Sequence, residues 1–150
     1  MQYALTGDDT FILNDVVLND LTDGSVVNIT YSNDRIGIST GKNDNTVFSD
    51  NRQGGNASAE LRVLRGSATD KFLNGLSVQQ ERDMVAFPVM NGSFSKRVGD
   101  GLGNISYDTF TLLGGMFQTF TDVQENNNGD TEQGSAVYTI TFAKVQRGIA

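Results

Sequence analysis

The segment AVYTITFAKV, Ala136–Val145, shows the pattern that decides the fold class. Tyr138, Ile140 and Phe142 alternate with smaller or more polar neighbours. Strict alternation in a segment rich in β-branched and aromatic residues predicts a strand with one face in the core. Ala57–Arg65 alternates in the same way, so we expect at least two half-buried strands.

Similar short segments recur outward from these two, between clusters of Gly, Asn and Asp, which indicates antiparallel sheet rather than βαβ units. The further strands expected are Phe11–Leu13 and Val16–Leu18 around the turn pair Asn14-Asp15, then Ser25–Tyr31, Arg35–Ser39, Val85–Met90, Ser93–Val98, Asn104–Leu113 and Met116–Val123. Pro88 is expected to mark an edge strand or a bulge, because proline cannot donate to a ladder. Gly114-Gly115 is expected to form a turn.

One helix is expected between the strands. The run Ser67–Asp70 resembles a capping box with Asp in place of Glu, and Phe72, Leu73 and Leu76 follow at helical spacing. These signals predict a helix over about residues 68–82.

A long polar loop is expected over about residues 40–56, where Val47 and Phe48 are the only sizeable apolar side chains. It is either a simple surface excursion or a functional loop, because structureless loops beyond about 12–15 residues are uncommon without a function. A second polar loop is expected at Glu125–Gly134. The chain is therefore predicted to be mainly β, an antiparallel β-barrel or sandwich with one flanking helix, and a single domain over residues 1–150.

Histidine and cysteine are both absent. Their absence excludes Ser/His/Asp triads, imidazole and thiolate metal ligands, and disulfides, and it suits assembly in a reducing cytoplasm. Acid–base catalysis would have to rest on carboxylates, Lys or Tyr. No apolar run is long enough to span a membrane, and the first residues lack the features of a secretion signal. We therefore predict no enzyme, no cofactor and no membrane insertion.

The formal charge of −7 is concentrated in residues 1–50, which hold eight acids against Arg35 and Lys42. Tight nucleic-acid binding requires a basic patch and is not expected, whereas an acidic surface would let nucleic acid pass without sticking. Arg62, Arg65 and Lys71 form the one local basic concentration. They are either solvated ends of a strand and a helix or a charged subunit interface that pairs with the acidic N-terminal third.

The acidic run Glu125–Glu132 does not match the spacing of a calcium-binding loop. Asp and Asn are also common turn residues, so an Asx-rich hairpin tip is the favoured interpretation there and at Lys42–Asp50. Gly101-x-Gly103 lacks the third glycine of a dinucleotide fingerprint and is better explained by a turn. No metal or cofactor site is predicted.

Five quoted segments carry a resemblance over nearly the whole chain: the opening hairpin FILNDVVL, the strand SVVNITY, RIGIST with its polar extension GKNDNTVFSDNRQGGN, the strand and helix AELRVLRGSATDKFLNGL, and the closing strand SAVYTITFAKV. In element order the chain resembles the tail tube proteins of contractile-tailed bacteriophages, which are similar in turn to the ring protein of type VI secretion. The resemblance rests on element order and local texture rather than on an invariant motif.

The resemblance implies a structural subunit, six copies of which close into a ring whose joined sheets line a channel for DNA passage during ejection. Rings would stack into a tube in the virion tail, assembled in the host cytoplasm. The implied partners are other copies of the chain, the surrounding tail sheath protein, and the tape measure protein and DNA in the lumen without tight binding. The loop Gly41–Gly55 would reach the neighbouring ring. The candidate inter-ring or inter-subunit contacts are Gly41, Lys42, Asn43, Asp44, Val47, Phe48, Asp50, Arg52, Arg62 and Arg65.

Two hypotheses from other classes are carried alongside. The first is a β-sandwich module that binds carbohydrate, or binds in a calcium-dependent way, through its polar loops. The second is a carboxylate-based hydrolase, which would need a pair of acids that the sequence spacing does not reveal.

Overall fold

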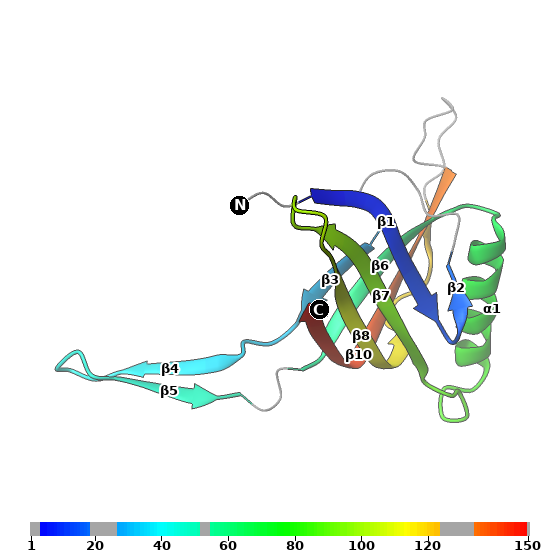
Figure 1. Ribbon diagram of the computed structural model, residues 1–150. Helices are drawn as coiled ribbons and strands as arrows, with labels where there is room; N and C mark the ends of the chain where they lie inside the picture. Colours follow the sequence, from blue (N-terminus) through cyan, green and yellow to red (C-terminus); the bar gives the residue numbers. More distant parts are fainter. Residues whose placement is uncertain (1–3, 19–26, 52–54, 124–133, 150) are drawn as a thin grey trace.

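Antiparallel strand pairing organises most of the chain (Figure 1). The computed structural model describes residues 4–18, 27–51, 55–123 and 134–149. The main sheet has the order β2-β1-β7-β8-β10-β6-β3, with β9 also paired to β10. Its strands are β1 (Ala4–Leu13), β2 (Val16–Val17), β3 (Val27–Tyr31), β6 (Ala57–Leu64), β7 (Met90–Gly99), β8 (Ile105–Phe117), β9 (Asp122–Val123) and β10 (Ser135–Ile149). Two further strands, β4 (Ile36–Thr40) and β5 (Thr46–Asp50), pair only with each other.

The main sheet curls over on itself, and its one helix, α1 (Ala68–Arg82), lies across one side (Figure 1). Within the described chain the end strands β2 and β3 do not pair with each other, so the sheet is an open, sandwich-like arrangement rather than a closed barrel. The prediction of a mainly β, antiparallel fold with one flanking helix is confirmed.

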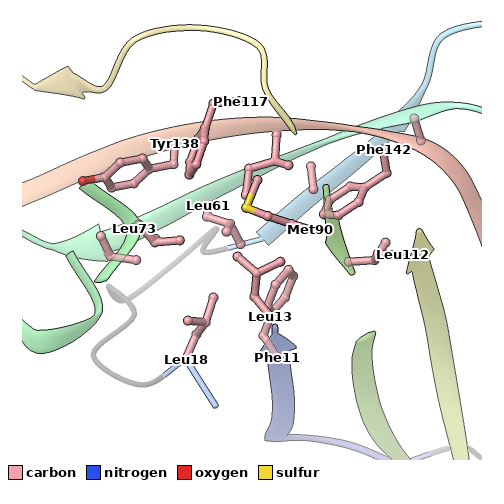
Figure 2. Close-up of a cluster of buried hydrophobic side chains, with 14 of the residues drawn as sticks. Phe11, Leu13, Leu18, Leu61, Leu73, Met90, Leu112, Phe117, Tyr138 and Phe142 are labelled. Atoms are coloured by element: carbon pink, nitrogen blue, oxygen red, sulfur yellow. The ribbon is translucent and has the colours of Figure 1, made fainter. Parts of the chain in front are cut away.

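The strands β6 and β10 are half-buried, as their alternation predicts. They are antiparallel neighbours in which Tyr138 stands opposite Leu61 and Ile140 opposite Ala59, and all four side chains are buried. The core extends from this pair to β1, β7, β8 and α1 (Figure 2). Its largest fully buried side chains include Tyr138, Phe11, Phe142, Leu13, Leu61, Leu73, Met90 and Leu112.

The helix α1 has the bounds that its sequence predicts. Ser67 caps it, since the Asp70 amide donates to the Ser67 hydroxyl at 3.2 Å, and the Asp70 carboxylate accepts from the Gly66 amide at 2.8 Å. Leu73 is fully buried, and Phe72 and Leu76 pack partly buried beside it. Packing of this stripe holds the helix against the sheet.

The Asp70 carboxylate also ties α1 to the core. The Tyr138 hydroxyl donates to Asp70 Oδ1 at 2.5 Å and lies 3.2 Å from the Asp70 carbonyl. Burial, and after it the hydrogen bond to Asp70, raises the pKa of Tyr138 well above its usual value. The hydroxyl is therefore held in its protonated, donating form.

The substitution Tyr138→Phe should lower the free energy of unfolding by about 1–2 kcal/mol at neutral pH, because the helix loses this hydrogen bond. The difference should shrink above about pH 10. There an unfolded tyrosine ionises while folded Tyr138, with its raised pKa, keeps its proton, so wild-type stability falls by up to about 1.4 kcal/mol per pH unit. The variant lacks this group. Urea unfolding at several pH values from neutral to alkaline measures both curves, and a pH-independent difference would contradict the raised pKa.

The opening hairpin forms as expected around Asn14-Asp15. Leu13 stands opposite Val16, and both turn residues have positive φ, 50° and 65°, as a tight turn of the hairpin type requires. Asn14 also joins this turn to the start of β7, where its side-chain oxygen accepts from the Asn91 amide at 3.1 Å. This bond fixes the turn of the N-terminal hairpin to the start of β7.

Two strand predictions are wrong, one between α1 and β7 and one at the end of β8. Residues 85–89, inside the expected strand Val85–Met90, form a turn and an irregular segment, so Pro88 lies between α1 and β7 and not in an edge strand. The Asp83 carboxylate accepts from the Ala86 amide at 3.3 Å and starts this turn after the helix. Further along, the expected strand Met116–Val123 is divided, because β8 ends at Phe117 and β9 holds only Asp122–Val123.

The turn expected at Gly114-Gly115 is also absent, because both residues lie within β8. A Cβ on Gly115 would lie 2.5 Å from Cε1 of Phe142 and 2.7 Å from its Cδ1. The glycine is needed for the close approach of a buried aromatic ring on the neighbouring strand β10.

The expected polar loop at residues 40–56 is an extended arm that contains a strand. Thr46–Asp50 forms β5 and pairs with β4, and only Gly41–Asn45 forms the connection between them. The prediction of a long loop is therefore wrong for its middle part. Arg52 and its neighbours, residues 52–54, lie outside the described residues.

Candidate functional site

The hairpin β4–β5 projects from the body of the molecule, on the side away from α1 (Figure 1). Every residue of its two strands is exposed. A lone two-stranded hairpin is marginally stable in water, and the described chain offers it no third strand. A projecting arm of this kind gains stability when it packs against another surface.

One face of this hairpin is apolar. Ile38 stands opposite Phe48 in the register, and Ile36 lies two residues before Ile38 on the same face. The exposed fractions are 42% for Ile36, 64% for Ile38 and 66% for Phe48. We call these three residues the apolar hairpin face. Val47, 62% exposed, points from the opposite face.

The tip of the hairpin is polar. The Gly41 amide donates to the Asn45 carbonyl at 2.7 Å and the Asp44 amide to the Gly41 carbonyl at 3.3 Å. Asp44 has a positive φ of 62°, a conformation that Asp and Asn tolerate better than most residues. Lys42 and Asn43 are exposed at the end of the arm.

Asparagine side chains fix the base of the hairpin. Asn33 Nδ2 donates to Asn56 Oδ1 at 2.7 Å, and Asn51 Nδ2 donates to the Asp34 carbonyl at 2.7 Å. The Asn51 amide continues the ladder with a bond to the Arg35 carbonyl at 3.1 Å. These bonds join the arm to β3 and β6 and set the direction in which it leaves the body.

A half-open cavity of about 1000 Å³ lies beside this base and the end of β10. Arg35, Asp50, Lys144 and Arg147 supply its charged groups. Arg147 makes a two-point pair with Asp108, with nitrogen–oxygen distances of 2.9 and 2.8 Å, and its hydrogen bonds lower the pKa of that carboxyl. Three of the four charged groups are basic, and one of these, Arg147, is already paired with Asp108.

The sheet surface opposite the core is rich in hydroxyl groups. Thr10, Ser95 and Thr109 stand side by side across β1, β7 and β8. On β10 and β6, Thr141 donates to Gln118 Oε1 at 2.6 Å, and Ser58 bonds the same oxygen at 3.1 Å. We call this surface the polar sheet face. It also exposes Leu64, Tyr107 and Leu113.

A groove forms where α1 ends beside the end of β8. It has a volume of about 290 Å³ and is lined by Ser77, Gln80, Glu81, Met84, Phe117, Gln118, Thr119 and Phe120. We call it the α1 groove. Met84 is 61% exposed and Phe120 78% exposed, and Val85 next to Met84 is 97% exposed. Gln80 fixes one wall, because its side-chain amide exchanges two hydrogen bonds with the backbone of Phe117 at 2.9 and 2.8 Å.

The sequence-based contact candidates fall into two groups. Seven of them, Gly41, Lys42, Asn43, Asp44, Val47, Phe48 and Asp50, lie together on the β4–β5 hairpin. Arg62 is exposed on β6 and Arg65 directly follows that strand, so these two are not part of the hairpin. Arg52 lies outside the described residues.

Sequence reasoning missed Ile36 and Ile38, and it missed the α1 groove. The alternation of Ile36 and Ile38 was a usable signal, but it indicates equally well a strand buried in the body. Met84 and Phe120 carry no signal of their own, because an isolated apolar residue is usually a core residue.

The described residues contain no group of three or more acidic side chains that could hold a metal ion. The acidic run Glu125–Glu132 lies wholly outside them, so the calcium interpretation of that run stays untested. Within the described chain, no helix is long and apolar enough to cross a membrane.

Comparison with known protein families finds no match, and no curated protein matches the sequence. Several solved structures share the fold. A chain of the cryo-EM structure of the anti-feeding prophage cap, the AFP tube terminating cap, aligns with a TM-score of 0.64 and 13% identity over 100% of this chain and 94% of that chain. A chain of the PVC sheath/tube terminator of an extracellular contractile injection system, in its extended state, aligns with a TM-score of 0.62 and 12% identity over 98% of each chain.

Proposed function

We propose that the protein is a structural subunit that assembles into hexameric rings, and that these rings stack as the inner tube of a contractile tail. The observation that carries the proposal is the apolar hairpin face, which stands exposed on an arm that projects from a well-packed body. Apolar surface presented in this way marks a contact with another protein. In this proposal the hairpin joins one ring to the next.

The shared fold supports the setting of a contractile apparatus. Both structural neighbours come from assemblies whose titles name a tube terminator or a tube terminating cap. A fold is compatible with many functions, so the argument for assembly rests on the surfaces of this chain. The proposed setting is the tail of a virion, with the sheath protein as the outer partner.

The open edges of the main sheet provide for ring closure. The strand β3 ends the sheet on one side, and β2 ends it on the other side and covers only the last residues of β1. Edge strands can pair across a subunit boundary, and a ring requires one edge to meet a different edge of the next copy. Pairing of this kind would join the sheets of neighbouring subunits into one surface.

The polar sheet face would then line the channel. Hydroxyl groups carry no fixed charge, and the basic residues on this face, Arg62, Arg97 and Lys144, stand on three different strands rather than in a row. Tight phosphate binding needs concentrated positive charge. DNA and the tape measure protein would pass such a wall without being held, and no catalytic turnover is involved.

Negative-stain electron microscopy and light scattering of the purified protein test the proposal. We expect rings and tubes that become more abundant as protein concentration rises. Monomers alone, over a broad range of concentration and salt, would overturn the proposal. A calcium-dependent rise in Tm, or retention on a glycan array, would instead favour a binding module.

A further inference from the structure

We propose that the α1 groove is the acceptor for the apolar hairpin face of a second copy of this chain. The inference rests on the proposed function, because it names the surface that the projecting hairpin contacts. The hairpin leaves the body on the side away from α1 (Figure 1), so it does not fold back into the groove of its own chain.

The two surfaces match in chemistry. The hairpin offers Ile38 and Phe48, and the groove offers Met84 and Phe120, all four more than half exposed. Methionine and aromatic side chains adapt well to inserted apolar groups. The groove volume of about 290 Å³ is at the lower end for a ligand pocket, which suits a few inserted side chains rather than a whole strand.

Charged residues of the hairpin and of the α1 groove favour one register. The tip of the hairpin carries one basic residue, Lys42, and one acidic residue, Asp44. Glu81 is the only charged residue that lines the groove. In the inferred pairing, opposite charges favour a register that places Lys42 beside Glu81, and like charges disfavour one that places Asp44 there.

The arrangement of the two surfaces limits the kind of assembly. A patch that meets a different patch on the next copy forms a head-to-tail contact, which either closes into a ring or repeats into an open stack. In the proposed function the sheet edges close the ring, so we assign the hairpin and the α1 groove to the stack. The inferred pairing therefore accounts for stacking along the tube and makes no use of the sheet edges that would close a ring.

Introduced cysteines test the pairing cleanly, because the chain has none of its own. Thr119→Cys places a thiol in the groove. Thr40→Cys places one on the same side of the hairpin as Ile38 and Phe48, and Ser39→Cys places one on the opposite side, one residue away. All the apolar contacts are kept. Each hairpin variant is mixed with a Thr119→Cys chain of different mass and treated with a short bifunctional thiol reagent.

We expect several-fold more mixed dimer from the Thr40→Cys mixture than from the Ser39→Cys mixture, and loss of the product when Phe48→Ser is added to the Thr40→Cys chain. Equal or absent cross-linking in samples that contain tubes by electron microscopy would overturn the groove assignment and leave the proposed function standing. Absence of both cross-links and tubes would overturn both. Selective cross-linking without tubes would support the groove pairing and contradict the tube.

Discussion

Replacing Phe48 by serine should abolish tubes at protein concentrations where the unchanged protein forms them. Phe48 is the most exposed residue of the apolar hairpin face, and its burial in a contact contributes about 1.5–3 kcal/mol. Each 1.4 kcal/mol is about a tenfold change in an association constant. Because every copy in a ring would make the same contact, the losses add, and stacking should fail even where single contacts are only moderately weakened.

The folded subunit should be unaffected by the same substitution. Phe48 contributes nothing to the core, so the free energy of unfolding of the monomer should change by no more than about 0.5 kcal/mol. Val47→Ser is the matched control, because Val47 is equally exposed on the opposite face. Sedimentation and electron microscopy measure assembly, and thermal unfolding measures stability. If both variants assemble like the unchanged protein, the hairpin is not the stacking contact.

The hairpin also shows why part of the site escaped prediction. Sequence periodicity predicts a strand where one face is buried and the other is not. In β5 the apolar residues Val47 and Phe48 are adjacent, so they point to opposite faces, and both are exposed. The strand therefore lacks the alternation that burial imposes. The sequence signals that this segment does contain are its polar composition and its turn residues, and both indicate a loop.

The body of the fold was predictable for the opposite reason. Every second residue enters the core in β6, and in β10 from Ala136 to Phe142, and at α1 the cap, the apolar stripe and the length agree. Local signals and tertiary packing point to the same structure in these elements. The open edges and the α1 groove were not predictable, because they depend on which elements become neighbours in space.

The pair Gly114-Gly115 is a case where a correct local rule gave a wrong result. Adjacent glycines usually mark a turn, and Gly114 does have a positive φ of 69°. The two glycines nevertheless lie within β8. Gly115 serves a steric purpose there, because a side chain at this position would collide with the Phe142 ring on β10. A single sequence contains no sign of a contact between strands more than twenty residues apart.

The substitution Gly115→Val should therefore lower the free energy of unfolding by about 3 kcal/mol, near the upper end for overpacked cores. Any Cβ at this position overlaps the ring of Phe142, which is fully buried, and the branched side chain adds two further methyl groups. Gly148→Val is the matched control, since Gly148 lies on β10 with no neighbour within 4 Å of its added Cβ. Urea unfolding of both variants measures the difference. If Gly115→Val is as stable as Gly148→Val, the ring of Phe142 does not lie against Gly115. A large loss in the free energy of unfolding, confined to Gly115→Val, would confirm that the glycine allows β8 to pack closely on β10. This close packing fixes the position of the polar sheet face relative to the core.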